Sequence, residues 1–503
     1  MEHLPVLIFA LIAALIAFLP IAAWLGGGIT RGFLAVLAGI ALTCLVMDVQ
    51  AGWLLGSPSL ALGVHLDRLS LLMTAFIAVI GFVVLGYADR YLVGDPKRGR
   101  FLSATTMVVA AALVQAVSPG LVQFAAGWIA VSLGVHVLLR HEEHRIGARL
   151  AARSKFLCSR LGDAAMAAAI AILWIDHGSA AFTGSWQGSP HGLLAACLCI
   201  VAAVVCKTAL VPCQHWLIGT IEAPTPLSAL LHAGVVNAGG LLLARSAGWF
   251  AGAPAALDAL IVVGLVSAVV GPLVMWCQSD LKRSLAWSTV GQMGFMTVQC
   301  GLGAPGAAIL HLIGHGFYKA NAFLRSGTYE HAIEGRPTPE PLVVAVLWWL
   351  LGLAVGGVGL ALTYTVVAGD PGHLPGGWPL VAIQAVALAQ VVASPTTTTA
   401  PRLARLALLV VLSAGYALLT WGAEVLLTPA LAIPPATPVL AWLAPVVLAA
   451  LGLFWVLLPT LASLPAVNAL RVHAANGFYL PLLSERLIRG RLLSSPATAL
   501  ESP

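Results

Sequence analysis

Charged residues are scarce in this sequence. Of its 503 residues only 9% are Asp, Glu, Lys or Arg, whereas 60% are hydrophobic, and the mean hydropathy is +0.97. A soluble globular protein carries about 25% charged residues, so this chain has too few to cover a water-facing surface of its size. The composition excludes a soluble enzyme and a disordered protein. It predicts an all-α polytopic membrane protein with about 14–15 transmembrane helices, because long apolar runs are typical of spanning helices and not of barrels.

Motifs for nucleotides, clusters and metals are also missing. The sequence has no P-loop, no GxGxxG-helix unit and no CxxC pair. Cys197 and Cys199 form a CxC within an apolar run, without His partners. We interpret all eight cysteines as small core residues and expect no metal site, disulfide framework or cofactor in this chain. They are Cys44, Cys158, Cys197, Cys199, Cys206, Cys213, Cys277 and Cys300.

Hydropathy divides the chain into fifteen apolar runs of spanning length. They are residues 4–24, 31–50, 68–88, 102–118, 119–139, 156–175, 193–213, 226–245, 254–276, 284–302, 305–324, 341–367, 378–394, 403–427 and 437–463. Four segments follow: N-terminal helices in 1–100, a first repeat in 101–250, a second, degenerate repeat in 251–430, and the last helix with a basic tail in 431–503.

Basic residues alternate in step with these runs. With the N-terminus outside, twenty of the 25 Lys and Arg residues, Lys155 among them, fall in loops or the tail on one side. Only Arg68 and Arg245 lie on the other side. The positive-inside rule then predicts an inner-membrane protein with its N-terminus outside and its C-terminus in the cytoplasm. The remaining three, Arg160, Lys207 and Lys319, lie within apolar runs.

Ionisable residues inside spanning helices are costly and usually functional. Lys207 lies deep in an apolar run and Pro212 follows five residues later, which predicts a broken helix beside a protonatable group. The alternative is a structural ion pair between two helices. His311, His315 and Lys319 are spaced i, i+4, i+8, on one helix face and about 6 Å apart along the axis. This spacing favours a proton relay over a set of packing histidines.

Further polar residues extend these two groups. Arg160 and Asp163 are spaced to pair with each other, but Asp163 could instead face Lys207. His232, behind a Pro-Thr-Pro helix start, either links Lys207 to the His311 helix or packs in the core. The sequence gives three more candidates for a relay or an ion pair, which are Glu222, Ser288 and Gln292.

Four strings in these regions resemble the antiporter-like subunits of respiratory complex I, most closely the L-type subunit. They are KTALVP from Lys207, APTPLSALLHAG from Ala223, SDLKRSLAWSTVGQMGFM from Ser279 and HLIGHGFYKANAFL from His311. The resemblance covers roughly residues 60–330. It implies two inverted five-helix repeats, each with a broken helix. It also implies ion translocation through Lys207, His232, His311, His315 and Lys319, with Asp163 nearby.

The sequence departs from that family at two places. Where the family has a glutamate paired with the lysine of the broken helix, this chain has Ile129, and its nearest polar groups are Ser132 and His136. The family also has a lysine or glutamate in the second broken helix, but no lysine follows Lys319 here. In residues 341–463 we find, as candidate polar groups for this position, at most Glu424, Tyr364, Gln384 and Gln390.

This chain is shortened and altered relative to the L-type subunit. In this it resembles the DabB family, the membrane subunits of DAB inorganic-carbon accumulation complexes. The stretch from Arg471 to Leu480 resembles that branch. The resemblance implies a large cytoplasmic DabA-like partner with zinc in a β-carbonic-anhydrase-like site. Cation influx, of H+ or Na+, would drive CO2 hydration there, and this chain would not be an enzyme. Alternatives are a pumping subunit of complex I or a membrane hydrogenase, an Mrp-type Na+/H+ antiporter subunit, and a non-conducting anchor.

Overall fold

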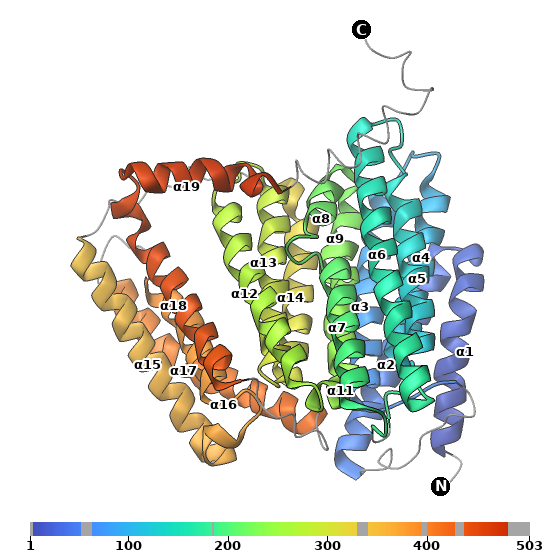
Figure 1. The fold of residues 1–503 in the computed structure, drawn as a ribbon. Coiled ribbons are helices and arrows are strands. Elements are labelled where there is room, and N and C mark those ends of the chain that lie inside the picture. The colour runs from blue at the N-terminus through green and yellow to red at the C-terminus, as the bar shows by residue number, and fades with distance from the viewer. Residues whose placement is uncertain are drawn as a thin grey trace.

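The described part of the chain is α-helical. A computed structural model describes residues 4–51, 63–183, 186–328, 341–393, 400–427 and 437–480, and no β-strand occurs among them. The long helices run side by side in one bundle (Figure 1). Eleven helices in the described ranges are long and apolar enough to cross a membrane. The predicted fold class, an all-α multi-pass membrane protein, is confirmed.

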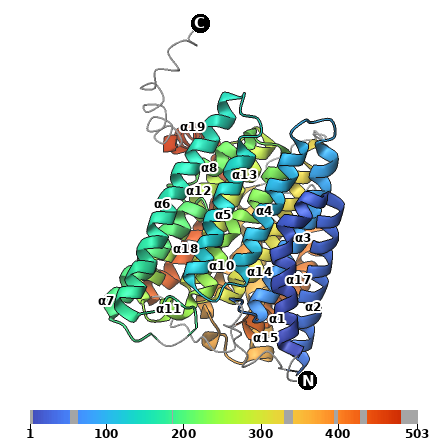
Figure 2. The same cartoon turned by 90° about the vertical axis from the view of Figure 1, so that its right-hand side faces the viewer.

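Seven long helices form the first part of the bundle. They are α1 (Leu4–Leu25), α2 (Gly27–Ala51), α3 (Arg68–Tyr91), α4 (Arg98–Ala116), α5 (Leu121–Leu139), α6 (Ile146–His177) and α7 (Pro190–Lys207). They cover the side of the molecule that faces the viewer in Figure 2. Each overlaps one predicted apolar run. However, α6 begins ten residues before the predicted position 156, so Lys155 belongs to a helix and not to a loop.

The chain is broken twice after α7. Short elements follow one another here: α8 (His215–Gly219), η2 (Thr220–Glu222), α9 (Thr225–Ala233), η3 (Val235–Asn237), α10 (Ala238–Arg245) and α11 (Ala247–Ala251). At the first break the backbone N–H of Val211 donates to Ser267 Oγ (3.0 Å) and Trp216 Nε1 donates to the Cys206 carbonyl (2.8 Å). Side chains thus satisfy backbone groups that the interrupted helix leaves unpaired, as irregular backbone at membrane depth requires.

Three long helices form the middle of the bundle. They are α12 (Pro254–Trp276), α13 (Leu281–Gly301) and α14 (Pro305–Leu324), followed by η4 (Ser326–Thr328). Glycines let α12 and α13 approach very closely. A Cβ added to Gly294 would lie 2.5 Å from the Ala268 nitrogen, and one added to Gly271 would lie 2.4 Å from the Gly291 nitrogen. Small residues at helix contacts are typical of membrane bundles.

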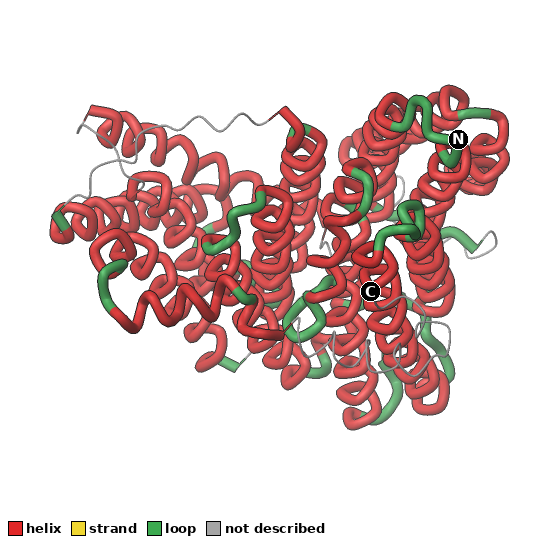
Figure 3. The backbone as a smooth tube through the Cα atoms, turned by 90° about the horizontal axis from the view of Figure 1, so that it is seen from above, coloured by secondary structure: helices red, strands yellow, loops and turns green. Residues whose placement is uncertain are grey.

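The remaining helices form the other end of an elongated array, seen from above in Figure 3. They are α15 (Leu342–Ala368), η5 (Pro371–His373), α16 (Gly377–Ala393), α17 (Ala400–Leu427), α18 (Pro438–Leu461), α19 (Pro465–Ala475) and η6 (Gly477–Tyr479). Helix α19 lies across the end of the bundle opposite to the start of α1 (Figure 1). Residues 394–399 and the tail from 481 lie outside the described residues, so the expected second broken helix and the basic tail stay predictions.

Candidate ion-translocation site

Lys207 ends α7 at the first break and is buried. Its Nζ donates to the carbonyl oxygen of Trp128 on α5 (2.9 Å) and lies 4.6 Å from the centre of the Trp128 ring. A carbonyl and an aromatic face both favour a cation, and neither carries a charge of its own. The predicted broken helix and buried lysine are therefore present together, and Trp128 holds the lysine.

Position 129, where the family has a glutamate, lies beside this contact. The Ile129 side chain is 36% exposed, on the edge of α5, whereas Trp128 is buried. The direct partner of Lys207 is thus the neighbouring backbone carbonyl of Trp128. His136 lies two turns further along α5, and its Nδ1 is 3.3 Å from the Ala152 carbonyl oxygen of α6.

Asp163 forms an ion pair with Arg160, Oδ2 to Nη2 at 2.6 Å, and both side chains of this pair on α6 are half-buried. Asp163 also lies near enough to Lys207 to interact electrostatically, although the ion pairs of the described residues join Asp163 to Arg160 and not to Lys207. The two placements of Asp163 that the sequence left open, beside Arg160 or facing Lys207, are therefore compatible. One carboxylate serves both bases.

Lys155 is a further buried base, which the sequence analysis counted among the cytoplasmic loop charges. That assignment was wrong. Lys155 is 1% exposed, and its Nζ donates to the carbonyl oxygen (2.5 Å) and hydroxyl (2.7 Å) of Ser132 on α5. The long charged segment before it hid this residue, since hydropathy places the helix start too late. The only hint of its position in the sequence is that Lys155 precedes Ser159 and Arg160 by about one helical turn.

The second group lies on α14. His311 is half-buried, with Nδ1 3.2 Å from Gln299 Oε1 of α13, and its ring centre is 6.1 Å from that of His315. Lys319 is fully buried, and its Nζ donates to the Leu285 carbonyl oxygen (2.8 Å) and to Ser288 Oγ. The predicted column of two histidines and one lysine on a single helix face is therefore formed.

His232 joins this column from α9. It is fully buried, its Nδ1 is 3.0 Å from Thr289 Oγ1, and its ring stacks on Phe323 at 4.4 Å. Electrostatic interactions couple it with both His315 and Lys319. His232 therefore lies beside the His311 helix and is packed in the core, and its link to Lys207 stays a prediction.

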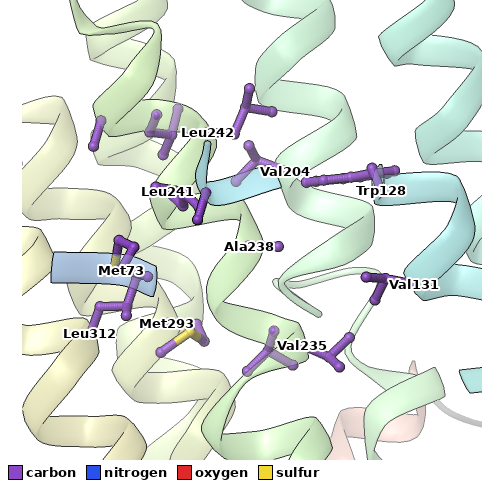
Figure 4. Packing of buried hydrophobic residues seen from close by; sticks show 14 of the residues in the cluster. Met73, Trp128, Val131, Val204, Val235, Ala238, Leu241, Leu242, Met293 and Leu312 are labelled. Carbon is purple, nitrogen blue, oxygen red and sulfur yellow. The ribbon is translucent and has the colours of Figure 1, made fainter. Parts of the chain in front are cut away.

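The broken helix formed by α9 and α10 lies between the two groups, since α9 and α10 pack on α14 and α10 also packs on α7. Trp128, Val204 and Ala238 belong to the apolar packing at this point (Figure 4). A cavity of about 40 Å³ borders it, lined in part by Gln115 and Asn237. Each of these two buried side chains has one polar atom without a partner among the described residues. The cavity has the volume of about two or three water molecules.

Two candidates lie apart from these groups. Gln292 is exposed on α13, although Ser288 on the same helix contacts Lys319. Glu222 lies in the short segment before α9, where its carboxylate is 3.9 Å from Arg145 at the start of α6. The sequence predicted Gln292 and Glu222 as possible relay or ion-pair residues. Glu222 fits the description of an ion-pair residue.

The second half of the chain contributes one acid to α14. Glu424 of α17 is buried, and its Oε1 accepts a hydrogen bond from the Ala307 N–H at the start of α14 (2.8 Å). Gly306 makes this approach possible, because an added Cβ would lie 2.6 Å from Glu424 Oε2. Tyr364 and Gln384 share a hydrogen bond nearby (3.0 Å). The sequence named these residues but could not place Glu424 at the end of the histidine column.

Three cysteines also converge on the first break. Cys158, Cys206 and Cys213 have their sulfur atoms within 4.8 Å of one another, and the last two are 3.8 Å apart. Cys158 and Cys206 are buried, as expected for small core residues, and the expected absence of a metal site stays a prediction. The break brings positions 206 and 213 together, and no spacing motif signals that.

Comparison with known proteins identifies the family. Residues 118–350 match the family described as NADH:quinone oxidoreductase/Mrp antiporter, TM, and residues 53–102 match NADH-ubiquinone oxidoreductase (complex I), chain 5 N-terminus. The protein named probable inorganic carbon transporter subunit DabB2, of Halothiobacillus neapolitanus, is 32% identical over 480 residues. That alignment covers 90% of this chain and 86% of that protein.

More distant relatives share part of the chain or only the fold. NADH-quinone oxidoreductase subunit L of Mycobacterium tuberculosis is 35% identical over 278 residues, which cover 54% of this chain and 44% of that protein. A chain of the Mrp complex from Dietzia sp. aligns with 98% of this chain and 57% of its own length, with a TM-score of 0.55 and 22% identity. The chain belongs to the DabB family of inorganic carbon transporter subunits, within the superfamily of complex I L-type and Mrp antiporter-like membrane subunits.

Proposed function

We propose that this chain is the cation-conducting membrane subunit of an inorganic carbon transporter, and that the cation is the proton. The column formed by His311, His315 and Lys319, extended by His232, supports this proposal most directly. These groups lie within reach of one another in a buried region and can each exchange a proton. Sodium would need oxygen ligands instead, and this column offers mainly nitrogen.

The route begins at the start of α14. Glu424 and Gln299 lie near the outer end of the column, and His311, His315 and Lys319 follow along the helix. His232 and the cavity beside the broken helix lead toward Lys207. This order assumes the predicted orientation in the inner membrane, with the N-terminus outside and the C-terminus in the cytoplasm.

The partner is a large cytoplasmic DabA-like protein that carries zinc in a β-carbonic-anhydrase-like site. Downhill proton flow through this chain drives CO2 hydration to bicarbonate on that partner, so catalysis does not occur here. The family membership of the chain and the name of its relative from Halothiobacillus neapolitanus support this assignment. The absence of the glutamate at Ile129 suits a downhill path, which does not need the charge pair of a redox-driven pump.

Purification of the chain from its native membrane tests this proposal. We expect one large co-purifying protein with stoichiometric zinc, and a deletion strain that grows in elevated CO2 but not in air. Cysteine labelling from either side of the membrane tests the orientation. The proposal fails if the complex contains no zinc protein and the deletion strain grows equally well in air.

The alternative function is that of an antiporter-like proton-pumping subunit. The match to subunit L of Mycobacterium tuberculosis supports it. Iron–sulfur partners with quinone- or ferredoxin-linked activity would favour a complex I or hydrogenase subunit. Sodium-sensitive growth of the deletion strain would favour an Mrp-type subunit.

A further inference from the structure

Lys155 is a buried base to which no role has been assigned. We propose that Lys155 is the proton carrier between Lys207 and the cytoplasmic end of α5 and α6, an inference that rests on the proposed function. Lys207 contacts α5 at Trp128, and Lys155 contacts α5 one turn later at Ser132. His136 follows one further turn along, against Ala152 of α6.

These three groups descend α5 in steps of four residues. Since α5 rises 1.5 Å per residue, each step is about 6 Å along the axis. Lys155 interacts electrostatically with Lys207 on one side, and His136 interacts with Lys155 on the other. The Ser132 hydroxyl accepts from Lys155 and, as a hydroxyl, still has a proton of its own to donate.

The charge balance of the region supports a carrier rather than a fixed tie. Lys155, Lys207 and Arg160 share the single carboxylate of Asp163, the ion-pair partner of Arg160. A second positive charge beside an uncompensated buried lysine is unfavourable, because like charges repel strongly in a region of low dielectric. A proton on Lys207 therefore disfavours one on Lys155, and passing the proton on toward the cytoplasmic end relieves the repulsion.

A structural tie and a proton carrier make different demands on this side chain. In Lys155→Gln the amide can still donate to Ser132 but cannot carry a proton. In Lys155→Arg the charge and the donors are kept, but the guanidinium does not release its proton. Arg153→Met, an exposed neighbour on α6, is the matched control.

The test measures proton uptake by proteoliposomes that contain the purified complex under an imposed pH gradient. We expect both Lys155 variants to lower the flux at least about tenfold while assembly and thermal stability stay as in the unmodified complex. A folded Lys155→Gln or Lys155→Arg complex with a flux within about twofold of the control would overturn the inference. Lys207→Met separates the two proposals: if it abolishes flux while Lys155 variants conduct, only the role of Lys155 fails.

Discussion

Each buried base at the first break rests on a carbonyl oxygen of α5 and not on a carboxylate. Lys207 donates to Trp128 and Lys155 donates to Ser132. Asp163, the ion-pair partner of Arg160, acts on both lysines without a direct hydrogen bond, so neither lysine has a carboxylate of its own that holds its proton. This arrangement differs from the lysine–glutamate pair that the family resemblance implies. It is consistent with a path that carries protons downhill.

His315 is the residue whose loss should stop transport with the least structural change. It is buried in the middle of the column, between His311 and Lys319. In His315→Gln the side chain stays polar and smaller than the imidazole but can no longer take up a proton. We expect proton flux to fall at least a hundredfold, about 10² being typical for a lost proton-transfer group. The exposed loop residue His144, changed to Gln, is the control, and normal flux in folded His315→Gln would refute the relay.

Restoring the family's acid at position 129 should not improve conduction. The Ile129 side chain lies on the partly exposed edge of α5, and Lys207 already has its partners at Trp128. In Ile129→Glu the new carboxylate would cost up to about 2.5–3.5 kcal/mol of insertion free energy without replacing those contacts. We expect less folded protein in the membrane and no rise in flux per complex, with Ile129→Gln as the neutral control. A higher flux would show that position 129 reaches Lys207.

At the scale of elements, loops at one end of the bundle are tied by ionic hydrogen bonds. Asp95 accepts from the Lys97 N–H (2.7 Å), and His141 Nε2 lies 2.8 Å from its other carboxylate oxygen. The Lys97 N–H and the His141 ring hold the pKa of the Asp95 carboxyl below its usual range. Its stabilising effect is therefore present above the unfolded pKa of about 4 and is lost as the pH falls through the lower folded value.

Asp95→Asn should loosen the connection between α3 and α4. Amide hydrogen exchange of residues 92–97 should be several-fold faster than in the unmodified chain at neutral pH. The difference should vanish in acid, where the carboxylate is neutral and the two chains become alike. Glu143→Gln, in the same exposed region, is the control. An equal difference at both pH values would contradict the role of the charge.

The contact of α12 with α13 depends on glycine. In Gly294→Ala the new methyl group would lie 2.5 Å from the Ala268 nitrogen, so the helices must separate. Overpacking of this kind costs about 1–3 kcal/mol, and we expect a lower thermal midpoint of the purified complex. Gly39→Ala on α2 is the control, because nothing lies within 4 Å of its added Cβ. Unchanged stability of Gly294→Ala would mean that the contact is looser than described.

At the scale of the whole molecule, the sequence predicted more of the bundle than of the site. The scarcity of charge predicted the class of protein, and each of the fifteen apolar runs corresponds to helical segments of the structure. Such runs are recognisable because length and apolarity are what a spanning helix requires. The column on α14 was predictable because i, i+4, i+8 spacing places residues on one face. Both features are local along the chain.

Contacts across the molecule were not predictable. Lys155 meets α5 across 23 residues of sequence, and Glu424 meets α14 across 117. The cysteine cluster forms only because the chain turns back at the first break. None of these pairings leaves a spacing signal in the sequence, whereas hydropathy misassigned Lys155 because charged neighbours precede it.

Proton uptake driven by a pH gradient, in proteoliposomes that contain the purified complex, tests the central claim most directly. The account predicts uptake by the unmodified complex and its loss in Lys207→Met and Lys319→Met, with normal assembly in both. Lys97→Met, in the connection between α3 and α4, should conduct normally. Undiminished uptake in a correctly assembled Lys207→Met complex would contradict conduction through this site and leave the chain as a membrane anchor for its partner.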